Sequence, residues 1–245
     1  MKFFLVSFSV IVTFFLFLYL GIGFYIASSI LKMDQTFGLH QNSLPNTWQA
    51  KVDAHNYINY SSYNLRKNFS SEKYYLDDWQ DVYFTSSEKG IKLNGWLFNY
   101  FSNRPIVIVV HGLFPNGKCK PESNLIASLL ISKKINALTI DLRNYGQSDT
   151  VSQYEDLGLH SYKDILGAIN FLEEIGFNSN QIGLLGISLG ASTAIFAAAE
   201  NKNINAVWAD SSLAEFNLIL RDEIARYGLP SIFGPAVSFG GKILT

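Results

Sequence analysis

Ser188 is the residue of this chain best suited to nucleophilic chemistry. It stands at the centre of Gly186-Ile187-Ser188-Leu189-Gly190, after an apolar run and before an alanine-rich segment. At a sharp strand-to-helix turn a serine projects its hydroxyl outward, and glycines two residues to either side leave room for that geometry. The pattern therefore predicts that Ser188 presents its hydroxyl as a nucleophile. The alternative is a glycine-rich turn with an idle serine.

A second group of residues is expected to handle negative charge beside this serine. His111-Gly112-Leu113 follows an apolar run at 106–110, and a helix is expected to begin next to Ser188. We expect the backbone N–H groups of Leu113 and Leu189 to bind the oxyanion of a tetrahedral intermediate. His111 is either a general base or a residue that shapes the loop, and we favour the second interpretation.

Three charged residues near the ends of other apolar runs are further candidates. Asp141 and Arg143 follow the run at 135–140, and Asp210 follows the run at 204–209. Asp141 is a candidate catalytic acid, but we favour a role in which its carboxylate accepts hydrogen bonds from loop amides. Arg143 is expected to brace the same loop. Asp210 is a possible catalytic acid, with a structural role as the favoured alternative.

These residues would be positioned by alternating strands and helices. Apolar and β-branched runs predict strands at 82–85, 91–98, 106–110, 135–140, 182–187 and 204–209, the first two forming a hairpin. Helical spacing predicts helices at 121–130, 162–172 and 191–200, with Asp164 on the polar side of the second. Such alternation predicts an α/β fold with a mostly parallel sheet covered on both faces. Chemistry then belongs beyond the carboxyl ends of the strands.

The ordered motifs of this chain resemble the α/β-hydrolase superfamily. The nearest likeness is to its membrane-anchored branch, often called serine aminopeptidase-like or α/β-hydrolase-domain proteins. The matching segments are Gly90-Ile91-Lys92-Leu93-Asn94-Gly95-Trp96, His111-Gly112, Asp141-Leu142-Arg143-Asn144-Tyr145-Gly146-Gln147-Ser148, Gly186 to Gly190, and Ala209-Asp210-Ser211. The resemblance implies a Ser-His-acid hydrolase that cleaves an ester, thioester or amide. Asn144 stands where relatives usually have glycine, and asparagine tolerates a left-handed backbone.

The histidines of this chain do not follow the order that the resemblance implies. In this fold the acid and then the histidine follow the nucleophile, but His40, His55, His111 and His160 all precede Ser188. Three explanations remain: a fragment whose C-terminal strands are missing, a catalytically inactive binding or scaffold protein, or recruitment of an upstream histidine such as His160. We expect the first.

The N-terminal segment is expected to cross a membrane. Phe3 to Leu31 contains no charged residue, and as a helix it would extend about 43 Å against a hydrocarbon core of about 30 Å. A cleaved signal peptide ending near Ala27-Ser28-Ser29 is the alternative, but its apolar run would be shorter. We expect a single-pass anchor that contacts the bilayer through residues 3–31, with the hydrolase domain on the extracytoplasmic side.

Composition and charge limit the remaining possibilities. The 245 residues carry a formal net charge of −1 and are 48% hydrophobic, which excludes general disorder and argues against nucleic acid as a partner. The single Cys119 excludes an internal disulfide and a cysteine-rich zinc site. No metal or organic cofactor is implied, and the expected substrate is a small acyl or peptide compound. The expected domains are an anchor at 1–32, a juxtamembrane connector at 33–80 and a partial α/β-hydrolase domain at 81–245, whose segment 228–245 would contribute to a cap.

Overall fold

The computed structural model divides the chain into two compact units. Unit 1 comprises Met1–Met33, Gln153–Asp156 and Leu213–Thr245, and unit 2 comprises Asp34–Ser152 and Leu157–Ser212. The structure describes residues 2–33, 44–48, 70–112, 123–212, 224–226 and 228–245. Most of the expected connector at 33–80 therefore lies outside the described residues.

Unit 2 contains a six-stranded sheet in the order β1-β2-β4-β3-β5-β6. The strands are β1 (Gln80–Thr85), β2 (Lys92–Phe98), β3 (Ile106–Val110), β4 (Asn136–Asp141), β5 (Ile182–Ile187) and β6 (Val207–Asp210). The pairs β1–β2 and β2–β4 are antiparallel, whereas β4, β3, β5 and β6 run parallel to their neighbours. Each strand overlaps one expected from the sequence, which confirms the mostly parallel sheet.

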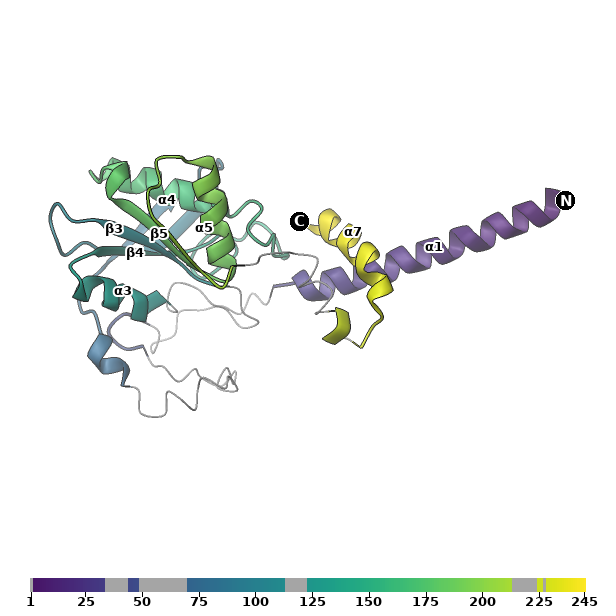
Figure 1. Cartoon of the computed structure of the whole chain (residues 1–245), viewed down its shortest axis with the longest axis horizontal. Coiled ribbons are helices and arrows are strands. Elements are labelled where there is room, and N and C mark those ends of the chain that lie inside the picture. The colour runs from purple at the N-terminus through teal and green to yellow at the C-terminus, as the bar shows by residue number, and fades with distance from the viewer. Residues whose placement is uncertain (1, 34–43, 49–69, 113–122, 213–223, 227) are drawn as a thin grey trace. The chain divides into compact units, whose positions relative to one another are not determined.

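Helices cover both faces of this sheet. The helix α3 (Asn124–Ser132) lies on one face, and α4 (Tyr162–Glu174) and α5 (Leu189–Glu200) lie on the other (Figure 1). Short 3-10 helices, η3 (Ser71–Tyr74) and η5 (Ser179–Gln181), precede β1 and β5. Because both faces are covered, the central strands can be apolar along their whole length, as β3 is.

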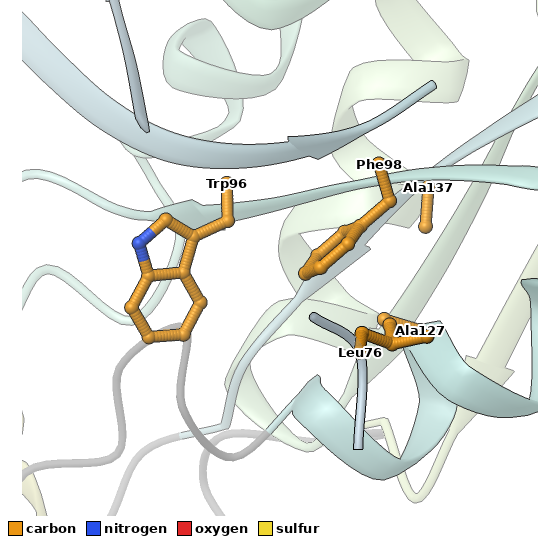
Figure 2. Close-up of a cluster of buried hydrophobic side chains, with 5 residues drawn as sticks. All are labelled: Leu76, Trp96, Phe98, Ala127 and Ala137. Atoms are coloured by element: carbon orange, nitrogen blue, oxygen red, sulfur yellow. The ribbon is translucent and has the colours of Figure 1, made fainter. Parts of the chain in front are cut away.

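A cluster of buried hydrophobic side chains holds α3 against the sheet. It consists of Leu76, Trp96, Phe98, Ala127 and Ala137. Figure 2 shows the side chains of Trp96 and Phe98 leaving β2 on the same side, toward Leu76 and Ala127. Residues two apart in a strand share a face, so the alternation in β2 places both rings in this cluster.

Asp164 corrects one expectation drawn from the spacing of α4. The sequence placed it on the polar side of the helix, but its side chain is fully buried. It lies one turn before Ala168, which is also fully buried, so it shares the helix face that packs inward. An ion pair with Arg143, described below, compensates the buried carboxylate.

Unit 1 is built around the N-terminal helix α1 (Lys2–Leu31). Its residues Ser7–Leu31 are long and apolar enough to cross a membrane. The C-terminal residues expected to contribute to a cap form η6 (Ser231–Phe233) and α7 (Gly234–Leu244), and α7 packs against α1 (Figure 1). The main chain at the end of α1 also bonds to 153–155, with Glu155 N–H donating to Leu31 O at 2.8 Å.

Candidate active site

The candidate site lies where the carboxyl ends of β3 and β5 meet. The chain passes from β3 to β4 on one side of β3, and β5 then lies on its other side. Such a reversal of strand order opens a crevice at the carboxyl ends in α/β sheets. Val110 pairs in register with Gly186, so the residues that follow the two strands are neighbours. A Cβ placed on Gly112 would lie 3.3 Å from the Ser188 Cβ.

Ser188 is the single residue between the end of β5 and the start of α5. Its backbone angles are φ 52° and ψ −111°, a conformation that residues other than glycine rarely adopt and that costs free energy. Its N–H donates to Asp210 O at 2.8 Å, and its carbonyl accepts from Ala191 and Ser192 N–H in the first turn of α5. The side chain is partly exposed, and its hydroxyl has no hydrogen-bond partner among the described residues. The hydroxyl thus stands on a fixed and strained backbone.

The two glycines around Ser188 permit this sharp turn. A Cβ on Gly186 would lie 2.1 Å from Gly190 O, and a Cβ on Gly190 would lie 2.4 Å from Val110 O. Both contacts are with backbone atoms, which cannot rotate away as a side chain can. Larger residues at either position would therefore push α5 away from β3 and β5.

Backbone N–H groups at the start of α5 face the region of Ser188. Leu189 is the first residue of this helix, so its N–H is among those that a helix leaves without an internal acceptor. The other expected oxyanion donor, Leu113, lies outside the described residues. Asp210 ends β6, with an exposed side chain whose Oδ1 accepts a hydrogen bond from Ser211 Oγ at 2.9 Å.

His111 is fully buried, and both of its ring nitrogens are engaged. Leu142 N–H donates to Nε2 at 3.2 Å, so the ring proton lies on Nδ1 and is donated to Gly112 O at 3.0 Å. The Tyr145 ring packs edge-on against the imidazole, with centroids 4.7 Å apart. This arrangement joins the loop after β3 to the loop after β4, and it leaves neither nitrogen to accept the Ser188 proton.

Asp141 lies inside the loop that follows β4. Its carboxylate is buried and accepts a hydrogen bond from Gln147 N–H at 3.0 Å. Gly146, with φ 52°, approaches so closely that a Cβ there would meet the carboxylate. Ser148 Oγ donates to Asp141 O at 2.6 Å. Asp141 therefore contacts the backbone and a side chain of its own loop, and the role favoured for it from the sequence stays a prediction.

Asn144 shows how the same loop tolerates the absence of a glycine. Its φ is 69°, in the left-handed region that asparagine adopts more readily than most residues. Its side-chain Oδ1 accepts hydrogen bonds from Val151 N–H at 2.7 Å and Ser152 N–H at 2.9 Å. The side chain thus holds the end of the loop, which a glycine would not do.

Arg143, which is itself buried, joins three parts of unit 2 through hydrogen bonds. Its guanidinium donates to Asp164 on α4 at 2.7 Å, to Glu88 in the β1–β2 turn at 2.8 Å and to Ser86 Oγ at 3.2 Å. Burial opposes the charge of Arg143, but the hydrogen bonds and charges of Asp164 and Glu88 outweigh it and raise its pKa. The hydrogen bond from Arg143 lowers the pKa of Glu88. The sequence did not indicate these partners, although the position of Asp164 one turn from the apolar Ala168 was a usable signal.

Among the described residues, no three His, Cys, Asp or Glu side chains come close enough together to hold a metal ion. A polar hollow of about 450 Å³ is lined by Asn178, Ser179, Asn180, Lys202, Asn203 and Asn205. These residues precede β5 and β6, so the hollow lies at the opposite end of the strands from Ser188.

Comparison of the sequence and the fold with known proteins finds similarity to hydrolases. The chain is 30% identical over 127 residues to a thiohydrolase, aneE, from Aspergillus aculeatus; the alignment covers 51% of this chain and 39% of that protein. The structure of an α/β hydrolase, GrgF, from Penicillium sp. sh18 superposes with a TM-score of 0.51 at 27% identity, covering 62% of this chain and 52% of that one. An esterase from Pyrococcus furiosus shares the fold, with a TM-score of 0.56 at 24% identity, covering 72% of this chain and 65% of that one.

The chain thus spans about two fifths of the length of the fungal thiohydrolase and just under two thirds of that of the archaeal esterase. A family described as having the alpha/beta hydrolase fold matches residues 105–236, which is more than half of the chain and includes β3, β4, β5, β6 and Ser188. From this match and from the strained serine at the end of β5, we conclude that the chain belongs to the alpha/beta hydrolase fold family.

Proposed function

We propose that this protein is a membrane-anchored serine hydrolase that cleaves an ester or thioester with Ser188 as the nucleophile. The observation that carries the proposal is the conformation of Ser188, held at φ 52° between β5 and α5 with a partly exposed hydroxyl. Strain of this kind persists only where the surrounding structure enforces it, and it concentrates at functional sites. The thiohydrolase similarity favours a thioester, whereas the Pyrococcus similarity supports only the fold.

In the proposed reaction Ser188 Oγ bonds to the carbonyl carbon while a general base takes its proton. The carbonyl π electrons move to oxygen, and the resulting oxyanion accepts hydrogen bonds from Leu189 N–H and, as proposed from the sequence, Leu113 N–H. One such donor typically contributes about 3 kcal/mol to lowering the barrier. The tetrahedral intermediate collapses to an acyl-serine as the alcohol or thiol leaves with the proton from the base. Water, deprotonated by the same base, then releases the carboxylic acid.

The general base of this mechanism is not identified among the described residues. His111 is occupied by Leu142 and Gly112, and no histidine follows Ser188 in the 245 residues. In this fold the acid and the histidine follow the nucleophile. We therefore propose that His111 is not the base, and we retain as a proposal the finer assignment to the serine aminopeptidase-like branch, in which a histidine later than the nucleophile has that role.

Membrane anchoring by α1 is the second part of the proposal. Its support is the apolar span Ser7–Leu31 and the packing of α1 against other residues of unit 1. Ile26 and Ala27 lie in a buried cluster with Ile224 and Val237, so cleavage near Ala27 would remove half of that cluster. A segment that is cleaved and discarded has no need of such packing, and we therefore favour a retained anchor. We propose that the hydrolase domain lies on the extracytoplasmic side.

Labelling with a fluorophosphonate tests the nucleophile. We expect the full-length protein to be labelled at Ser188 and to hydrolyse a short acyl thioester, and Ser188→Ala to abolish labelling and reduce turnover about 1,000-fold or more. Ser132→Ala, at an exposed serine that ends α3, is the control and should retain both. Residues 1–245 alone should show no efficient turnover.

Two results would overturn the assignments. Turnover by residues 1–245 that is lost in His160→Ala would identify an upstream histidine as the base. An unlabelled full-length protein would favour the alternative function, a catalytically inactive membrane-tethered binding or scaffold protein. That alternative is supported by the order of the residues, since His40, His55, His111 and His160 all precede Ser188.

A further inference from the structure

The helix α7 packs against α1 through small residues that bring the two backbones very close. A Cβ on Gly23 of α1 would lie 2.4 Å from the Cβ of Ala236, and one on Gly240 of α7 would lie 2.7 Å from Phe24 Cα. Approach of this kind is typical of helices that pair within membranes, where small residues permit close van der Waals packing. Gly23 of α1 and Gly240 of α7 are therefore the residues that allow the two helices to lie this close together.

The turn before α7 is also fixed to α1. Tyr19 Oη donates a hydrogen bond to Ile232 O at 2.7 Å, and the Tyr19 and Phe233 rings stack with centroids 5.8 Å apart. Together with the cluster of Ile26, Ala27, Ile224 and Val237, these contacts cover one side of α1 from Tyr19 onward.

The opposite face of η6 and α7 is apolar and uncovered. The exposed fractions are 69% for Ile232, 51% for Phe239 and 60% for Ile243. Phe239 and Ile243 are one turn apart, so they share one face of α7. Residues 228–245 contain no acidic residue, and their only charge is Lys242, near the C-terminal end of α7. Exposed apolar residues that share one helix face, such as Phe239 and Ile243, mark a surface that meets a partner.

The position of this apolar face along α1 indicates which partner the face meets. About 20 residues of helix cross the hydrocarbon core, and α1 is exposed on all sides from residue 7 to residue 18. Counted from Phe3, about 20 residues bring the helix to Ile22. The contacts of α1 with η6 begin at Tyr19 and those with α7 extend from Gly23 to Leu31, so α7 lies beside the part of α1 that leaves the hydrocarbon. Tyr19 and Tyr25 suit that depth, since tyrosine concentrates at membrane interfaces. Lys32 and Lys242 are placed to reach anionic headgroups.

We propose that η6 and α7 form an interfacial membrane helix that lies on α1 and inserts Ile232, Phe239 and Ile243 into the bilayer surface. The partner is a lipid bilayer, and the inference rests on the membrane anchoring proposed for α1. The protein then contacts the bilayer through a span and through a short helix packed along the end of that span, from Gly23 to Leu31. The apolar face of this helix and its single lysine match the membrane interface.

Depth-dependent quenching tests this proposal on the full chain in vesicles of phosphatidylcholine and phosphatidylglycerol. Cys119, the single cysteine, is first replaced by serine. An environment-sensitive fluorophore is then attached in separate proteins at Phe239→Cys, Ile243→Cys, Phe14→Cys in α1, and Ile175→Cys at the end of α4 in unit 2. Spin-labelled lipids quench it from the headgroup side or from deep in the acyl chains. We expect shallow quenching at 239 and 243, deep quenching at 14 and none at 175.

The controls separate this inference from the anchor on which it rests. Quenching at 14 without quenching at 239 and 243 would overturn the interfacial helix and leave the anchor in place. An absence of quenching at all four positions would refute the anchor itself. Gly240→Leu, whose side chain would collide with Phe24, should reduce quenching at 243 and leave that at 14 unchanged. Undiminished quenching at 243 in that variant would show that α7 does not depend on α1.

Discussion

At the scale of single residues, the turn that carries Ser188 depends on the lack of a side chain at Gly186 and Gly190. Ser188 N–H bonds to Asp210 O on β6, and its carbonyl bonds into α5. The strained φ of 52° is thus maintained from both sides. Space for this arrangement exists because Gly186 and Gly190 have no Cβ.

Gly186→Ala should therefore destabilise the protein and impair the proposed catalysis. Its Cβ would lie 2.1 Å from Gly190 O, which forces the backbone of α5 to move and should lower the free energy of unfolding by about 2 kcal/mol or more. Urea unfolding of the detergent-solubilised chain, followed by tryptophan fluorescence, measures the change.

Gly183→Ala on the same strand is the matched control. A Cβ there meets its nearest neighbour, Val107 Cγ2, at 3.6 Å, an ordinary van der Waals contact. The free energy of unfolding should then change by no more than about 0.5 kcal/mol. If both variants lowered the free energy of unfolding equally, replacement of any strand glycine would be the cause, and not the close approach of Gly186 to Gly190.

At the scale of elements, Arg143 connects the loop after β4 to α4 and to the β1–β2 turn. Arg143 and Asp164 are almost completely buried, whereas Glu88 is partly exposed. Arg143→Gln should lower the free energy of unfolding by about 3–5 kcal/mol, because it leaves the buried Asp164 carboxylate without its compensating charge. The same urea titration measures this loss.

Two variants show whether the uncompensated charge is the cause. Lys163→Gln removes the other ion pair of Glu88, which is 3.3 Å long and partly exposed, and should cost no more than about 1 kcal/mol. The double variant Arg143→Met, Asp164→Leu should recover much of the stability, since paired apolar replacements often match a buried ion pair. A double variant as unstable as Arg143→Gln would contradict the charge explanation.

At the scale of the whole molecule, α1 is part of the packed structure of unit 1. Intact-mass measurement of the protein purified from membranes should therefore find residues 2–33 still present, and alkaline extraction should leave the protein in the membrane fraction. The physical reason is that Ile26 and Ala27 are buried against Ile224 and Val237. An N-terminus at Ser28, Ser29 or Ile30 in the purified protein would instead identify a cleaved signal peptide.

Much of the fold was predictable because its signals are local. The β-branched run of β3 and the apolar run of β5 are typical of strands buried on both faces, and they lie where the sequence indicated. The turn at Ser188 was predictable for the same reason, since the glycines, the preceding strand and the following helix are adjacent in sequence. The helix α7 is different, because glycines at 234, 240 and 241 disfavour an isolated helix.

The sequence by itself determined the alternation of strands and helices, the apolar length of α1 and the serine at the end of β5. Only the tertiary structure decided which residues meet across long sequence separations: His111 with Leu142, Arg143 with Asp164 and Glu88, and α7 with α1. Periodicity reports the side of an element on which a residue lies, but not which distant residue will face it. A buried charge such as Asp164 is tolerable only once its partner is in place, so its burial follows from packing that no local pattern records.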